Sequence, residues 1–159
     1  MGFLSKLRIV QLFIAGAAIF SMIACSSLTV VRVEGNAMLP AYKDGDRVAV
    51  QKDAGSIERL DVIIFRYPED TTKTYIKRVI GLPGETISIE DGKVTIDGKE
   101  LAEPYVDPDL NRSEFHLHNF KVKPDSYFVM GDNRDNSSDS RYWGAVNKEL
   151  VIGKCFLQY

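Results

Sequence analysis

The sequence predicts an all-β domain of coiled antiparallel sheets or a partial barrel, preceded by one N-terminal transmembrane helix. Three observations support this prediction. Residues 9–31 carry no charged side chain, the chain after Arg32 alternates apolar and polar residues in short runs, and these runs end at turn-forming residues. β-branched and aromatic residues dominate the runs, and no stretch beyond residue 32 sustains a helical period.

The uncharged N-terminal segment is expected to anchor the protein in a membrane. Residues 9–31 exceed the roughly 20 apolar residues that a helix needs to cross a bilayer. Lys6 and Arg8 precede this segment, so residues 1–8 are expected to stay in the cytoplasm. Residues 32–159 would then form one extracytoplasmic domain on the outer side of the plasma or inner membrane.

Two other interpretations of the same segment stay open at this point. It resembles a cleavable signal peptide, although its apolar run is longer than the roughly 7–15 residues of a typical signal core. It also resembles a lipoprotein signal, because Met22-Ile23-Ala24 precedes Cys25 as in a lipid-modification motif. All three interpretations place the folded part outside the cytoplasm, and the length of the run favours the retained anchor.

The β prediction for the rest of the chain depends on runs that alternate and then stop. Asp91-Gly92 separates two such runs with a pair of residues suited to a tight hairpin, and Asp97-Gly98 offers a second turn directly afterwards. Residues 101–124 are the least patterned part, and we expect an excursion with a short strand there. The expected strands are residues 47–50, 61–67, 74–80, 86–90, 93–96, 127–130 and 151–159.

The composition argues against several function classes. The net charge is −2 and the basic residues are scattered among the acidic ones, unlike a nucleic-acid-binding face. Cys25 and Cys155 belong to no cluster with metal-ligand spacing, and His116 and His118 have no third candidate ligand nearby in the sequence. The sequence also contains no phosphate-binding or cofactor motif. We therefore expect no nucleic acid, metal or cofactor among its partners.

Lys77 stands out because it interrupts a predicted apolar strand. Successive side chains of a strand alternate, so Lys77 and Arg78 point to opposite faces and one of them must meet an apolar side. An ammonium group desolvated there has a lowered pKa, and a neutral amine can act as a general base. The alternative is a lysine on the exposed face of an edge strand, which the alternation alone favours.

The second unusual segment is a dense polar loop at residues 131–144. Its first part mixes carboxylates with guanidinium groups, and Tyr142 and Trp143 lie near its end. Such a loop is either a solvated surface turn or a charge-paired structure packed against the domain. The large aromatic residues favour the packed structure, and loops held in this way commonly orient catalytic groups.

Several segments together resemble the type I signal peptidase family, which consists of membrane peptidases with a Ser/Lys dyad. GDNRDNSSDSRYWG at residues 131–144 matches the C-terminal motif of that family, and YIKRVIGLPGE at residues 75–85 matches the motif of its general-base lysine. GDRVAV at residues 45–50 and VIGKCFLQY at residues 151–159 extend the resemblance over nearly the whole chain. The resemblance implies an endopeptidase that removes signal peptides from exported preproteins.

The resemblance also implies roles for individual residues at the catalytic site. Lys77 corresponds to the general base of the family. Ser137 corresponds to the hydroxyl that hydrogen-bonds to this lysine and orients it. Asp139 and Arg141 correspond to a supporting ion pair in the same polar loop. No cofactor or metal belongs to this mechanism, so none is expected.

Substrate binding is expected next to these residues. Met38, Tyr75 and Ile76 fall where the family lines shallow pockets for the small side chains that precede the cleaved bond. An extended substrate would pair with an edge strand and insert those side chains into the pockets. The partners implied by the resemblance are the cleavage regions of preproteins and the lipid bilayer.

The resemblance fails at the position of the nucleophile. The family motif reads Ser-Met-x-Pro, whereas the matching segment is Ala37-Met38-Leu39-Pro40. A methyl group cannot attack a carbonyl carbon, so the acyl-enzyme route is closed and we expect an inactive or severely impaired peptidase. The alanine is an engineered change, a natural divergence, or a sign that another hydroxyl such as Ser137 acts instead. The expected role of Ser137 beside Lys77 argues against the last of these.

Functions from different classes therefore remain. The first is a membrane endopeptidase of the signal peptidase type. The second is a non-catalytic protein that binds signal-peptide ends or regulates a true peptidase. A self-cleaving repressor with a Ser/Lys pair is disfavoured, because it predicts a DNA-binding module where this chain has the apolar segment of residues 9–31.

Overall fold

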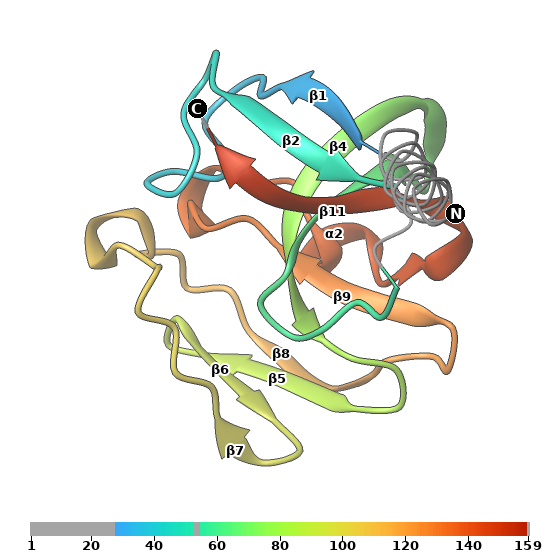
Figure 1. Cartoon of the computed structure of the whole chain (residues 1–159). Helices are drawn as coiled ribbons and strands as arrows, with labels where there is room; N and C mark the ends of the chain where they lie inside the picture. Colours follow the sequence, from blue (N-terminus) through green and yellow to red (C-terminus); the bar gives the residue numbers. More distant parts are fainter. Residues whose placement is uncertain (1–27, 53–54, 159) are drawn as a thin grey trace, which may run out of the picture.

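The computed structural model describes residues 28–52 and 55–158, which fold into two antiparallel sheets (Figure 1). The larger sheet has seven strands in the order β1-β2-β11-β3-β4-β9-β10, and the smaller has four in the order β7-β6-β5-β8. Every strand pairing in the described ranges is antiparallel, which confirms the all-β prediction. The strands are β1 (Leu28–Arg32), β2 (Arg47–Gln51), β3 (Val62–Tyr67), β4 (Asp70–Gly81), β5 (Thr86–Glu90), β6 (Lys93–Ile96), β7 (Lys99–Glu100), β8 (Leu117–Lys121), β9 (Ser126–Met130), β10 (Val146–Asn147) and β11 (Val151–Gln158).

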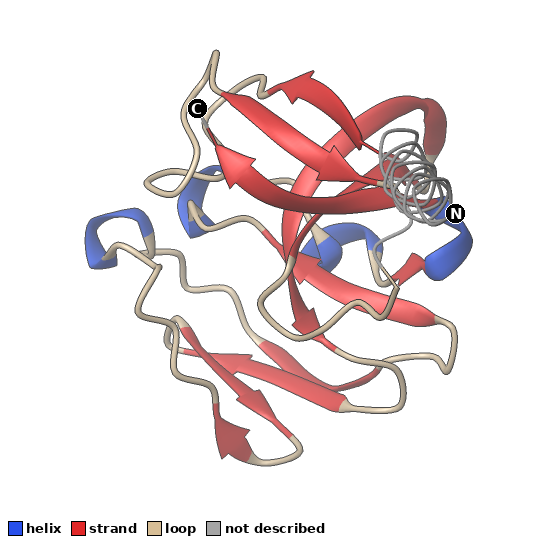
Figure 2. Ribbon diagram, viewed as in Figure 1, coloured by secondary structure: helices blue, strands red, loops and turns tan. Residues whose placement is uncertain are grey.

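Short helical segments lie in the connections between strands (Figure 2). They are η1 (Pro108–Leu110), η2 (Arg134–Asn136), α2 (Ser140–Trp143) and η3 (Lys148–Leu150). In the polar loop, Asn133 caps η2 and Asp139 caps α2, each accepting a backbone N–H with its side-chain oxygen. Residues 131–144 therefore form a series of capped turns rather than a solvated tip.

The strands expected from the sequence are all present, together with the hairpin turn between β5 and β6. Asp91 and Gly92 have φ angles of +48° and +74°, the left-handed conformations that such a turn requires. The unpatterned residues 101–124 contain the single strand β8, as expected. The short strands β7 and β10 were not predicted, because two residues carry no alternation.

The predicted transmembrane helix is wrong for residues 28–31, which belong to β1. In β1 the side chains of Leu28 and Val30 are exposed while Val31 is half-buried, and Val30 pairs with Ala49 of β2. Strand β1 begins within the uncharged run, so composition alone could not distinguish its residues from those of the predicted helix. Residues 9–27 of the predicted span lie outside the described residues, and no helix among the described residues is long and apolar enough to cross a membrane.

β4 is the long strand that joins the halves of the larger sheet. Its residues 74–78 pair with β3, and Arg78, Val79 and Gly81 pair with β9. Lys77 lies opposite Ile63 of β3, β4 is an interior strand between β3 and β9, and the Lys77 side chain is buried rather than on an exposed face. The edge-strand alternative for this lysine is therefore wrong.

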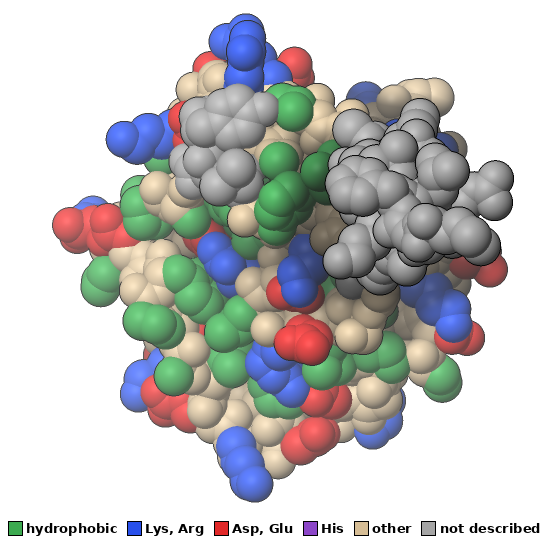
Figure 3. Space-filling model, viewed as in Figure 1, with side chains coloured by type: hydrophobic (Ala, Val, Ile, Leu, Met, Phe, Trp, Pro, Cys, Tyr) green, Lys and Arg blue, Asp and Glu red, His purple; other side chains and the backbone are tan. Residues whose placement is uncertain are grey.

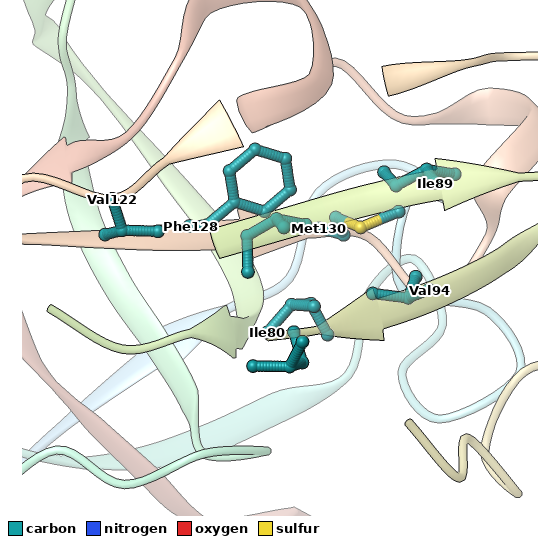
Figure 4. Packing of buried hydrophobic residues seen from close by; sticks show 8 residues of the cluster. Ile80, Ile89, Val94, Val122, Phe128 and Met130 are labelled. Atoms are coloured by element: carbon teal, nitrogen blue, oxygen red, sulfur yellow. The ribbon is translucent and has the colours of Figure 1, made fainter. Parts of the chain in front are cut away.

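Apolar side chains from both sheets pack into one cluster between them (Figure 4). Ile80 of β4 and Phe128 and Met130 of β9 meet Ile89 of β5 and Val94 of β6, and all are at most 3% exposed. Two further clusters lie within the larger sheet, one around Val48 and Ile64 and the other around Phe65 and Val129. Fully burying one such aliphatic side chain contributes about 1.5–3 kcal/mol.

The surface carries charges of both signs, which are interspersed over the face seen in Figure 3. Its ion pairs include Lys93 with Glu100 and Arg112 with Asp109, all of them exposed. Exposed pairs of this kind contribute little to stability. The buried ion pairs gather instead around the polar loop.

Candidate active site

A groove of about 650 Å³ lies between the segment that begins in β1 and the middle of β4. One wall is formed by residues 30–35 and the other by residues 74–77. Val48 of β2 and Ile64 of β3, both almost fully buried, complete the apolar part of the lining. Ala37 and Lys77 line this same groove although they are remote in sequence, so the fold brings the two expected catalytic positions together.

The turn that carries Ala37 is fixed by contacts of its backbone. Gly35 has a φ of +80° and donates its N–H to Asp44 Oδ1 at 2.7 Å. Asn133 donates its backbone N–H to Ala37 O and its side-chain amide to Asn36 O, both at 3.1 Å. The polar loop therefore holds position 37 through the main chain, independently of which side chain stands there.

Lys77 is a buried amine in the groove, only 5% exposed. Burial lowers the pKa of Lys77 to about 8, against the opposing influence of the Asp139 and Asp132 carboxylates. Its Nζ donates a hydrogen bond to Ile76 O at 3.0 Å and lies 5.1 Å from the centre of the Tyr75 ring. The lowered pKa makes the neutral amine more accessible near physiological pH than in an ordinary lysine, as a general base requires.

The Asp139–Arg141 ion pair is completely enclosed. Arg141 donates through Nε to Asp139 Oδ1 at 2.8 Å and through Nη2 to Asp139 Oδ2 at 3.0 Å. Asp139 Oδ2 also accepts the backbone N–H of Gly131 at 3.0 Å, and Arg141 Nη2 donates to Ser137 O at 3.4 Å. The pair thus links both ends of the polar loop, consistent with the packed structure that the sequence indicated.

Ser137 is buried next to position 37, but its hydroxyl has no partner in the described part of the chain. A Cβ placed on Gly131 would clash with Ser137 Oγ and with Ala37 O, which shows how closely the three residues pack. Ser137 Oγ has no hydrogen-bond partner among the described residues, and Lys77 Nζ bonds to Ile76 O instead. The expected hydrogen bond between Ser137 and Lys77 is therefore not formed in this structure.

Two of the three predicted substrate-contacting residues line the groove. Tyr75 and Ile76 are on the β4 wall. Met38 is 1% exposed, packs in the same cluster as Val48 and Ile64, and is not among the residues that line the groove. The structure therefore places Met38 in the supporting core and corrects its predicted position at the surface of the pocket.

Sequence reasoning missed part of the charge network around the polar loop. Arg78 donates through Nε and Nη2 to the two oxygens of Asp132, at 2.8 and 2.6 Å. Arg134 pairs with Glu103, whose side chain comes from the unpatterned segment. The alternation of β4 did indicate that Lys77 or Arg78 faces inward, and both prove to be largely buried. Nothing in the sequence around Glu103 indicated its partner.

Comparisons with known proteins agree with this geometry. The sequence model of a family described as signal peptidase, peptidase S26, matches residues 6–159. A probable signal peptidase I-1 from Synechocystis is 35% identical over 137 residues, which cover 80% of this chain and 68% of that protein. Signal peptidase I V from Bacillus subtilis is 37% identical over 136 residues, which cover 77% of this chain and 80% of that protein.

A solved structure gives the same assignment. The crystal structure of a signal peptidase I from Enterococcus faecalis matches with a TM-score of 0.53 and 34% sequence identity, covering 64% of this chain and 98% of that one. By homology, the fold and the sequence define a peptidase of the serine class. More specifically, the chain belongs to the signal peptidase family, peptidase S26.

Proposed function

We propose that the chain is a signal peptidase I-like membrane endopeptidase of the Ser/Lys type, and that Ala37 leaves it inactive or severely impaired. The observation that carries this proposal is the shared groove of Ala37 and Lys77. A hydroxyl at position 37 would have a buried amine in the same groove to accept its proton, while the methyl group offers no nucleophile. The backbone N–H of residue 37 would help to hold the oxyanion.

The substrate is the cleavage region of an exported preprotein in an extended conformation. β1 is an edge strand of the larger sheet and forms one wall of the groove, so an added peptide strand can bond to free backbone groups there. The apolar side chains of Val48, Ile64 and Ile76 suit small residues before the cut. Residues 9–27 of the uncharged segment directly precede β1, which supports a single-pass anchor and an extracytoplasmic groove close to the bilayer surface.

A non-catalytic binder of signal-peptide ends is the second candidate. It is favoured by the combination of a well-formed groove with a methyl group at the nucleophile position. Such a protein would retain peptide binding and release the peptide uncut, or it would regulate an active peptidase.

The decisive experiment restores the hydroxyl in the full-length protein in lipid vesicles. We expect Ala37→Ser to cleave a preprotein at least about 1,000-fold faster than the unaltered chain, because losing a nucleophile costs several orders of magnitude. The rate should rise with pH towards the Lys77 pKa of about 8 and then level off, since the amine must be neutral to act.

A second substitution assigns the base. Lys77→Ala in the Ala37→Ser protein should abolish cleavage, whereas Lys73→Ala should leave it unchanged, because Lys73 is exposed and pairs with Asp70. A folded, membrane-inserted Ala37→Ser protein without activity contradicts the peptidase proposal. Tight binding of an uncut peptide by that protein would establish the second candidate, and cleavage by the unaltered chain would refute the claimed impairment.

A further inference from the structure

The segment after β7 reaches back from the smaller sheet to the polar loop. Glu103, in the connection between β7 and η1, bonds with both carboxylate oxygens to Arg134, at 2.5 and 3.1 Å. The two side chains are 10% and 1% exposed, so this is a buried ion pair. Further along, Asp135 of the polar loop accepts the backbone N–H groups of Arg112 and Ser113.

Arg134 connects Glu103 to the backbone that packs beside position 37. Its Nε donates to Gly131 O at 3.0 Å, while the N–H of Gly131 is held by Asp139. Gly131 packs directly against Ala37 O and Ser137, with no room for a side chain. Each of the two peptide groups of Gly131 is therefore held by a side chain, one by Asp139 and the other by Arg134, which is paired with Glu103.

Tyr105 couples the same segment to the strand of the base. Its hydroxyl donates to Glu103 Oε1 at 2.6 Å, and its ring lies 4.2 Å from the Arg78 guanidinium carbon. Arg78 follows Lys77 in β4 and is bonded to Asp132 of the polar loop. Burial raises the pKa of Tyr105, so the phenol stays protonated and remains a donor to the carboxylate.

We propose that Glu103 is a positioning residue of the catalytic site, which acts through Arg134 and, with Tyr105, through Arg78. It is the carboxylate that bonds directly to this buried guanidinium, which would otherwise lose its ion-pair partner and move towards water. Its removal shifts the Gly131 peptide and with it the carbonyl and N–H groups of residue 37. The catalytic part of this inference rests on the proposed function.

The first test measures kinetics in the Ala37→Ser protein. We expect Glu103→Gln to lower kcat about 10-fold to 100-fold with KM changed less than about twofold, because small misplacements of reacting groups cost rates of this size. Glu103→Asp should recover part of the loss. The matched control is Glu100→Gln, since Glu100 is nearby in the chain but its pair with Lys93 is exposed.

The second test needs no activity and uses the unaltered chain. Glu103→Gln should accelerate amide hydrogen exchange at Gly131 and Asn133 at least about 10-fold, while amides of β2 and β11 keep their protection and show that the domain stays folded. Tyr105→Phe, which removes one hydrogen bond and keeps the ring over Arg78, should give a smaller acceleration at the same amides.

The outcomes separate the two proposals. An inactive Ala37→Ser protein contradicts the proposed function, and the exchange measurement then still decides the role of Glu103. Unchanged exchange at Gly131 and Asn133 in Glu103→Gln overturns the positioning role. An active Ala37→Ser protein whose kcat is unaffected by Glu103→Gln overturns its catalytic part. If Glu103→Gln unfolds the domain, the kinetic and exchange measurements are made on Tyr105→Phe instead. Unchanged exchange or unchanged kcat in that variant then counts against the proposal in the same way.

Discussion

The apolar cluster between the sheets and the buried carboxylates of the polar loop are held by different forces. Ile80, Ile87 and Phe128 in the cluster are 0% exposed, and so are Asp132 and Asp139 in the loop. The cluster gains free energy from every apolar atom removed from water. The loop must offset the desolvation of its charges with ion pairs, which leaves little net stabilisation.

The apolar cluster mainly determines the stability of the domain, whereas the polar loop mainly determines the geometry of the site. Apolar contacts have no direction, so the cluster between the sheets stabilises the domain while tolerating small shifts. Directed bonds hold Gly131 within the loop, and Asn133 of the loop donates hydrogen bonds to the carbonyl oxygens of Asn36 and Ala37. We therefore expect substitutions in the cluster to change the free energy of unfolding, and substitutions in the loop to change the site more than the stability.

The largest loss of stability is expected in the cluster. Phe128→Ala should lower the free energy of unfolding by about 4 kcal/mol, because it empties a fully buried aromatic position. Denaturant unfolding measures this loss. Phe156→Ala is the matched control, because its ring is 51% exposed, and it should change stability by less than about 0.5 kcal/mol. Similar losses for both variants would contradict the assignment of the core.

A smaller change in the free energy of unfolding, in the opposite direction, is expected on replacing Lys77. Its pKa is lowered from 10.5 to about 8 in the folded state, so the folded protein releases this proton at lower pH than the unfolded chain does. The destabilisation is complete below about pH 8 and fades as the pH rises towards 10.5. Lys77→Met should therefore raise the free energy of unfolding by up to about 3 kcal/mol at pH 7, since one pKa unit corresponds to about 1.4 kcal/mol.

Unfolding curves at several pH values test this prediction. The gain from Lys77→Met should shrink steadily between pH 8 and pH 10. Lys73→Met, at an exposed position of the same strand, should show no such pH dependence. A gain that is constant over this range would show that packing rather than desolvation is responsible.

The smallest effect is expected at Ser137. Its buried hydroxyl has no partner in the described part of the chain, so Ser137→Ala should leave stability unchanged or raise it by up to about 1 kcal/mol. Ser140→Ala is the contrasting variant, because Ser140 Oγ accepts the N–H of Val129 at 2.9 Å, and it should lose about 1–3 kcal/mol. Equal losses in thermal unfolding would mean that Ser137 is bonded after all.

The parts predicted from the sequence are those with a local signal. The β-branched and aromatic runs of β3 and β4, the alternation of β5 and the Asp91-Gly92 turn predicted the β fold, and the interruption of an apolar strand singled out Lys77. Local patterns could not reveal Glu103, because its burial depends on Arg134, which is far away in the chain. They also merged β1 with the uncharged segment before it, since both are apolar and uncharged until Arg32.

The lowered pKa of Lys77 also has a consequence for populations of molecules. With a pKa of about 8, about one molecule in ten holds a neutral amine at pH 7, and about half do at pH 8. In an Ala37→Ser protein, the acidity of the surrounding solution would therefore regulate how many copies are ready to react at any moment. A mild acidification would silence most of these copies without unfolding or displacing any part of the chain.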